Sequence, residues 1–388
     1  MESISSQKLK LQFKEILKSY EGKDPATDHF QDSDFKAEID SICPDKTHRN
    51  YDKIFSKAKW LRAKEILEIS DGENLFEKLD PKNLAQGILG VSPFIGTIAA
   101  LSESRERVEK LFNTKEANLY GVYSVNVFVN SIPTEIIVDD YFSCYEWGKP
   151  LFSKSRENEL WILILEKAWA KICGSYTNAG FGRVQEILEN LTGAPSVSLR
   201  LDEISEEQLW KRANFWNKKS YIMAGVMGNV VSKALGMTPA HTYPLIGTID
   251  AGTHKVFKFR NPWGVLAWSG DFSNEWEGWT QELQSKIGYD KNEGDVFYMT
   301  VADFKKYFVT LDCCYYLDQF QRQHINLKQE GNKGSYFEFE VEEASDVFIW
   351  VTQQSKQLQK EDYKYSPVDL FLMQDVESNA LVKIGNYF

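Results

Sequence analysis

Cysteine and histidine supply many catalytic bases, nucleophiles and metal ligands, and this chain has five of each. The cysteines are Cys43, Cys144, Cys173, Cys313 and Cys314. Their odd number and scattered spacing exclude a secreted disulfide framework, and no CxxC pair indicates a zinc ribbon. The adjacent Cys313 and Cys314 are expected to point to opposite faces of a strand. We therefore expect reduced thiols, with structural roles for Cys144 and Cys173.

Serine and histidine side chains form a second candidate group. Ser92 precedes Pro93, and this pair is typical of a helix start, because the hydroxyl can cap free backbone N–H groups and proline tolerates the first helical position. Taken alone, His241 is best interpreted as a hydrogen-bonded core histidine. The other histidines are expected at the surface: His29, His48, His254 and His324.

Length and charge limit the class of protein. The 388 residues include 45 basic and 56 acidic side chains, which gives a net charge of −11. This balance argues against nucleic acid or an anionic membrane surface as the main partner. No targeting segment is visible at the start, and the longest apolar stretch, 160–165, is far too short to span a bilayer. We therefore predict a cytoplasmic protein with two or three domains and no transmembrane segment.

The elements that would position these side chains follow from hydrophobic periodicity. Amphipathic helices are predicted within 1–25, from Pro93 onward and over 157–172. A strand pair is predicted over 122–138. Beyond residue 205 the pattern favours strands, and Gly252 permits a hairpin that spans 243–260.

Four strand-like runs follow residue 335: 336–341, 346–352, 368–374 and 380–387. They are typical of part of a β-sandwich. Because the last run would leave an unpaired edge at the chain end, we expect that this module either continues in a longer protein or is truncated.

Six stretches between residues 86 and 299 occur in an informative order: QGILG at 86–90, GVY at 121–123, VDD at 138–140, ELWILILEKAWAKICGSY at 159–176, KFRNPWG at 258–264 and EGDVFYM at 293–299. Together they resemble the protease core of the calpains, the intracellular, calcium-dependent, papain-like cysteine proteases. The resemblance implies an α+β, papain-like fold of two subdomains. It places a mainly helical subdomain at 30–204 and an antiparallel β subdomain at 205–325, between an N-terminal helix and linker (1–29) and a partial β-sandwich (326–388).

The resemblance also implies roles for individual residues. Position 92 lies 149 residues before His241, and Asn261 lies 20 residues after it, which suits a papain-like site. His241 would be the general base and Asn261 would orient its ring. Gln86 and the backbone N–H of residue 92 would form the oxyanion hole, and Trp263 would shield the His–Asn hydrogen bond.

The nucleophile region departs from the family pattern. Where the calpains have Gly-Asp-Cys-Trp, this chain has Gly90-Val-Ser-Pro93. A second departure is Pro244, which lies shortly after His241 in the sequence. A serine hydroxyl ionises much less readily than a thiol, so the thiolate–imidazolium pair is lost. We therefore predict a pseudoprotease that keeps the cleft and binds a peptide or protein partner. The alternatives are an active calcium-dependent cysteine-type endopeptidase, if residue 92 is misassigned, and a Ser-based hydrolase.

Calcium binding by the core is another implication of the resemblance. At the first implied site Asn83 replaces a family aspartate, while Glu159 is kept. At the second site Ala267 and Asn274 replace an acidic pair, while Glu293 and Asp295 are kept. Because hard cations need several oxygen ligands, usually including carboxylates, we expect weak calcium binding or none.

Overall fold

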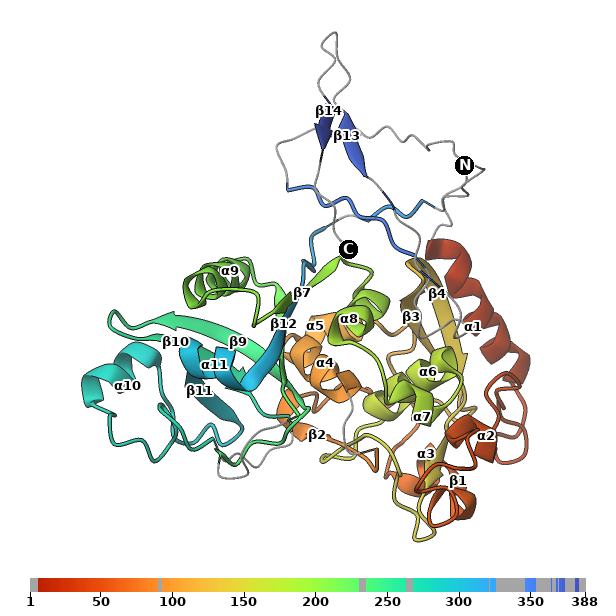
Figure 1. Ribbon diagram of the computed structural model, residues 1–388. Helices are drawn as coiled ribbons and strands as arrows, with labels where there is room; N and C mark the ends of the chain where they lie inside the picture. Colours follow the sequence, from red (N-terminus) through yellow and green to blue (C-terminus); the bar gives the residue numbers. More distant parts are fainter. Residues whose placement is uncertain are drawn as a thin grey trace.

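A computed structural model describes residues 6–89, 93–229, 235–262, 268–320, 322–325 and 346–353, and the short pieces 364, 368, 370–373 and 381–383. Within these residues the chain has an α+β architecture, with a mainly helical first half beside a second half built on a sheet (Figure 1). Ser92 and Trp263 lie outside the described residues.

The first half contains short strands around two central helices, α4 and α6. Its helices are α1 (Ser6–Tyr20), α2 (Ile39–Ile42), α3 (Ala63–Ile66), α4 (Pro93–Ser102), α5 (Arg105–Glu109), α6 (Trp161–Cys173), α7 (Tyr176–Ala179) and α8 (Val184–Thr192), with 3-10 turns η1 (Phe55–Lys57) and η2 (Pro81–Asn83). Its strands are β1 (Lys59–Arg62), β2 (Leu84–Ala85), β3 (Tyr123–Val129), β4 (Ile132–Val138), β5 (Tyr141–Cys144) and β6 (Lys154–Ser155).

Helix α6 runs through the centre of the first half. Its C-cap residue Gly174 has a φ of 84°, the left-handed conformation that commonly closes a helix. The helix is buried nearly all round, including the charged side chain of Lys167. Lys167 pairs with Asp139 and donates to the Tyr141 carbonyl at 2.6 Å, and these contacts offset its desolvation.

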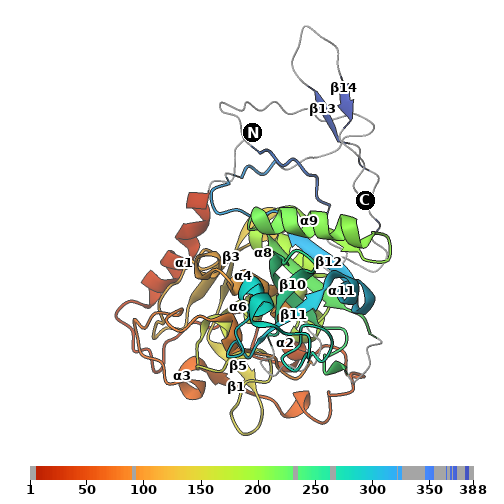
Figure 2. The same cartoon turned by 90° about the vertical axis from the view of Figure 1, so that its left-hand side faces the viewer.

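The second half is built on six antiparallel strands in the order β11-β10-β9-β8-β12-β7. These strands are β7 (Ser196–Arg200), β8 (Ile222–Met227), β9 (Thr242–Asp250), β10 (Lys255–Arg260), β11 (Val296–Thr300) and β12 (Phe308–Cys314). The described residues of the second half also form three helices, of which α9 (Glu206–Lys218) and α11 (Val301–Tyr307) lie beside the sheet (Figure 2). The third, α10 (Gln281–Ile287), lies between β10 and β11 in the sequence. Strand β7 precedes the expected boundary at residue 204, yet it joins this sheet by pairing with β12.

The sheet is buried on both faces where β8 and β12 pair. Met223 and Cys313 pack into the core beside α9 and α11, whereas Ala224 and Cys314 pack against the helices of the first half. The opposite orientations predicted for Cys313 and Cys314 are therefore confirmed. All five cysteines are buried and free of disulfides.

Several sequence predictions can be compared with these elements. The hairpin over 243–260 is confirmed, since β9 and β10 pair antiparallel with Lys255 opposite Asp250. The strand pair forms as β3 and β4, while the helix expected from residue 157 begins at Trp161. No helix in the described parts of the chain is long and apolar enough to cross a membrane.

The C-terminal runs are described only in part. Strand β13 (Phe371–Met373) pairs antiparallel with β14 (Leu381–Lys383), within two of the four predicted runs. The described stretch 346–353 contains no strand, contrary to the expectation for 346–352. The first run, 336–341, lies outside the described residues.

Candidate functional site

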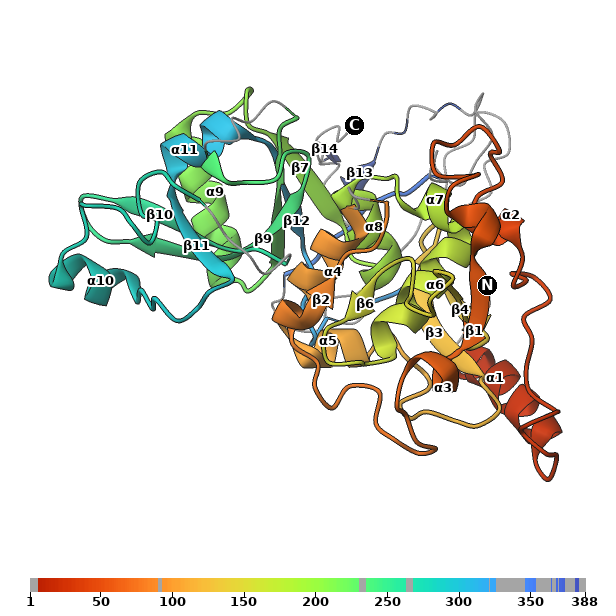
Figure 3. The same cartoon turned by 90° about the horizontal axis from the view of Figure 1, so that it is seen from below.

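The two halves meet where α4 packs on the start of β9 (Figure 3). The contact is made by Gly96: a Cβ atom there would lie 2.4 Å from Thr242 Cβ and 2.7 Å from the Thr242 carbonyl oxygen. Only a glycine permits so close an approach without displacement. Position 92 directly precedes α4, and His241 directly precedes β9. The contact between Gly96 and Thr242 therefore sets the distance between the two elements that these positions precede.

His241 is buried, with 6% of its surface exposed. Its Nδ1 lies 2.9 Å from the Pro239 carbonyl oxygen. A carbonyl can only accept, so Nδ1 carries the proton in the neutral ring and the lone pair lies on Nε2. Burial lowers the pKa of His241 although the bond to Pro239 opposes this, so the neutral form is favoured. In this arrangement Nδ1 is unable to take a proton from a nucleophile.

The residue before His241 adopts a strained backbone conformation. Ala240 has a φ of 57°, in the left-handed region that side chains with a Cβ rarely adopt. A glycine would adopt the same φ without steric cost.

Asn261 lies at the same end of the sheet as His241. It directly follows β10, and the register sets Phe259 opposite Leu245, close to the start of β9. Its backbone N–H donates to the Asp295 carbonyl at 2.7 Å, and only 6% of the residue is exposed. Strand β9 runs through Pro244, which is opposite Ala224 of β8, so this proline does not end the strand.

The segment that carries Gln86 is fixed against 151–153. A Cβ atom on Gly87 would lie 2.2 Å from Phe152 Cα, and the Ile88 N–H donates to the Leu151 carbonyl at 2.8 Å. Gln86 itself lines a small hollow that also contacts Ser153 and Glu166. These contacts hold the backbone next to Gln86 in place, and the oxyanion-hole role implied for Gln86 stays a prediction.

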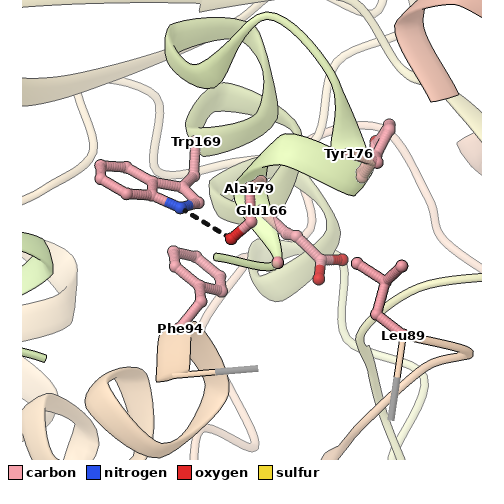
Figure 4. Close-up of a pocket in the computed structure, with 7 residues that line it drawn as sticks. Leu89, Phe94, Glu166, Trp169, Tyr176 and Ala179 are labelled. Atoms are coloured by element: carbon pink, nitrogen blue, oxygen red, sulfur yellow. Dashed lines mark hydrogen bonds between the residues drawn. The ribbon is translucent and has the colours of Figure 1, made fainter. Parts of the chain in front are cut away.

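Glu166 was not predicted as a site residue, although it lies in the motif at 159–176. It lines the hollow of Figure 4 together with Leu89, Phe94, Trp169 and Tyr176, and its carboxylate points toward Leu89. Ser153 donates to it from its N–H at 2.7 Å and from its hydroxyl at 2.5 Å. Burial raises the pKa of Glu166 to about 7, despite these two hydrogen bonds. The adjacent charged residues Glu166 and Lys167, set among the apolar residues of this helix, were the signal that could have identified it.

No thiol near the site replaces the missing nucleophile among the described residues. Burial raises the pKa values of Cys144 and Cys173 to about 12, so both stay protonated at neutral pH. Their interior positions agree with the structural roles expected for them.

The residues implied for calcium do not fit the ion. Glu293 pairs with Lys258 at 2.9 Å and Asp295 pairs with Arg260. Glu159 is 8% exposed, and burial raises the pKa of its carboxyl group. In the described parts of the chain, no three His, Cys, Asp or Glu side chains gather as a metal site would require.

Comparison with known proteins agrees with this architecture. The calpain family cysteine protease pattern matches residues 30–315. The calpain-type cysteine protease ADL1 of Oryza sativa subsp. japonica is 28% identical over 304 residues, which are 74% of this chain and 14% of that protein. DEK1 of Zea mays gives the same values, and Calpain-14 of Homo sapiens is 28% identical over 306 residues, 74% of this chain and 42% of its own length. The chain spans less than half the length of these relatives.

Proposed function

Since the chain belongs to the calpain family of cysteine proteases, we propose that it is a non-catalytic member that binds a peptide or protein partner between its two halves. The observation that carries this proposal is the hydrogen bond from His241 Nδ1 to the Pro239 carbonyl. This bond occupies Nδ1, burial keeps the ring neutral, and the sequence has Ser92 rather than cysteine at the nucleophile position.

The chemistry of that pair supports loss of proteolysis. A cysteine protease attacks with a thiolate that is stabilised by an imidazolium ion. The Ser92 hydroxyl keeps its proton at neutral pH, and burial keeps His241 neutral. Neither partner then carries the charge on which the thiol mechanism depends. Binding of an extended chain needs only main-chain hydrogen bonds and side-chain contacts, so it survives this change.

A second candidate function is proteolysis by an active endopeptidase or a Ser-based hydrolase. The observation in its favour is that Gln86, His241 and Asn261 are all present, and that the latter two are buried at one end of the sheet. This reading requires either a cysteine at position 92 or a base that activates the hydroxyl through Nε2.

The two functions can be separated with fluorescein-labelled casein and calcium. We expect the purified chain to release no soluble fluorescence, and we expect fluorescence anisotropy to report binding of casein fragments. Ser92→Ala should bind equally well. Turnover by the wild-type chain that disappears in Ser92→Ala would refute the non-catalytic proposal.

We also propose that the protein is cytoplasmic. The five cysteines are buried and form no disulfide, which supports this, because a reducing compartment keeps cysteines in that state. Fractionation of cells that express a tagged chain tests it, and recovery with secreted proteins would contradict it.

A further inference from the structure

At the first calcium site that the resemblance implies, backbone carbonyl groups accept hydrogen bonds from groups of the protein itself. Arg156 donates from its guanidinium group to the Lys82 carbonyl at 2.5 Å, and from its N–H to the Asn83 carbonyl at 2.7 Å. The Asn83 amide in turn donates to the Lys78 carbonyl at 3.2 Å. Backbone carbonyls are common calcium ligands, and here they accept from protein donors.

At the second implied calcium site, the side chains of Lys258 and Arg260 pair with the two retained carboxylates. Lys258 lies 2.9 Å from Glu293, with side chains 23% and 39% exposed. Arg260 pairs with Asp295, and here the exposures are only 16% and 14%. Partial burial makes the Arg260 pair less open to screening by salt than an ordinary surface pair.

Arg260 also reaches the other half of the molecule. Its Nε pairs with Glu103, and its Nη2 donates to the second Glu103 oxygen at 3.2 Å. Glu103 directly follows α4 of the first half, whereas Asp295 directly precedes β11 of the second. The planar guanidinium group of arginine suits two carboxylates at once, which the point charge of lysine does not.

We propose that these internal cations take the place of calcium, and that the Glu103–Arg260–Asp295 bridge holds the two halves together without the ion. The bridge is anchored at the end of the same helix that meets β9 through Gly96. It therefore adds a second contact between α4 and the second half, while Lys258 pairs with Glu293 and Arg156 donates to the Lys82 and Asn83 carbonyls.

The test is thermal unfolding of the full chain in millimolar calcium chloride and in EGTA. We expect the wild-type chain to have the same Tm in both. Arg260→Met should lower Tm by about 3–6 °C under both conditions, because two carboxylates lose their partner. Arg105→Met is the matched control, since the ion pair that Arg105 makes among the described residues is with Glu109 within α5, and its side chain is 47% exposed. It should leave Tm unchanged.

A second variant covers the case in which Arg260→Met does not fold. Glu103→Gln leaves the Arg260–Asp295 pair intact and removes the charge at the first-half end of the bridge. We expect it to lower Tm and to increase the radius of gyration measured by small-angle X-ray scattering. A rise in wild-type Tm with calcium, or calcium binding detected by calorimetry at micromolar concentration, would overturn the proposal. So would a Tm and radius of gyration of Glu103→Gln that match those of the wild-type chain.

Discussion

The contact between Gly96 and Thr242 makes a prediction about how the two halves are held. In Gly96→Ala the new Cβ would lie within 2.4–2.8 Å of Thr242 Cβ, its carbonyl oxygen and Cγ2. Thr242 is 2% exposed and one of the close atoms is backbone, so the strand has little room to yield. The helix or the strand must shift.

Two opposing free-energy terms decide the size of the effect. Alanine is favoured over glycine inside a helix by about 1 kcal/mol. Overpacking a filled core costs about 1–3 kcal/mol, and the upper part of this range applies because the contact includes backbone. We expect a net loss of about 1–2 kcal/mol in the free energy of unfolding. This corresponds to a Tm lower by about 2–8 °C.

The assay is urea unfolding followed by tryptophan fluorescence. Gly294→Ala is the control, because Gly294 has an ordinary φ and a Cβ there would meet nothing within 4 Å. The double variant Gly96→Ala/Thr242→Gly should recover part of the loss, since it removes two of the three close atoms. If Gly96→Ala is as stable as the wild-type chain, the reasoning about this contact is wrong.

Three further predictions concern neighbouring residues. The folded pKa of Glu166, about 7, lies above the ordinary 4.5, so the folded state holds this proton more tightly and its stability falls as pH rises from 4.5 to 7. The fall should be about 3 kcal/mol, and Glu166→Gln should flatten this part of the curve measured by urea unfolding. Ala240→Gly should raise the free energy of unfolding by about 1 kcal/mol because it relieves the strained φ; unchanged or lower stability contradicts this. Ser92→Cys should not gain casein turnover, because His241 still donates to Pro239; robust cleavage by this variant would show that the frame is competent.

The sequence predicted those parts of the fold that depend on neighbouring residues. Gly252 and the flanking strand patterns predicted the β9–β10 hairpin, and strand alternation predicted the orientation of Cys313 and Cys314. The resemblance assigned His241 and Asn261, which the structure sets at one end of the sheet. That assignment rested on motif order rather than on periodicity.

Features that depend on distant residues could not be predicted in this way. Glu103 and Arg260 are 157 positions apart, and only the packing of α4 on the sheet brings them together. The raised pKa of Glu166 depends on burial by side chains from several elements. The bond from His241 to Pro239 depends on the backbone path between them, which residue types do not specify.

The sheet formed by β8 and β12 has a practical consequence for dissecting the molecule. Ala224 and Cys314 belong to the core of the first half, while Met223 and Cys313 belong to that of the second. If either half were expressed alone, the apolar surface that it buries at the β8–β12 pair would be exposed to water. Exposed apolar surface of this kind promotes aggregation. Heterologous production should therefore keep 30–315 on one polypeptide, and a variant that damages either core should lower the yield of the whole protein.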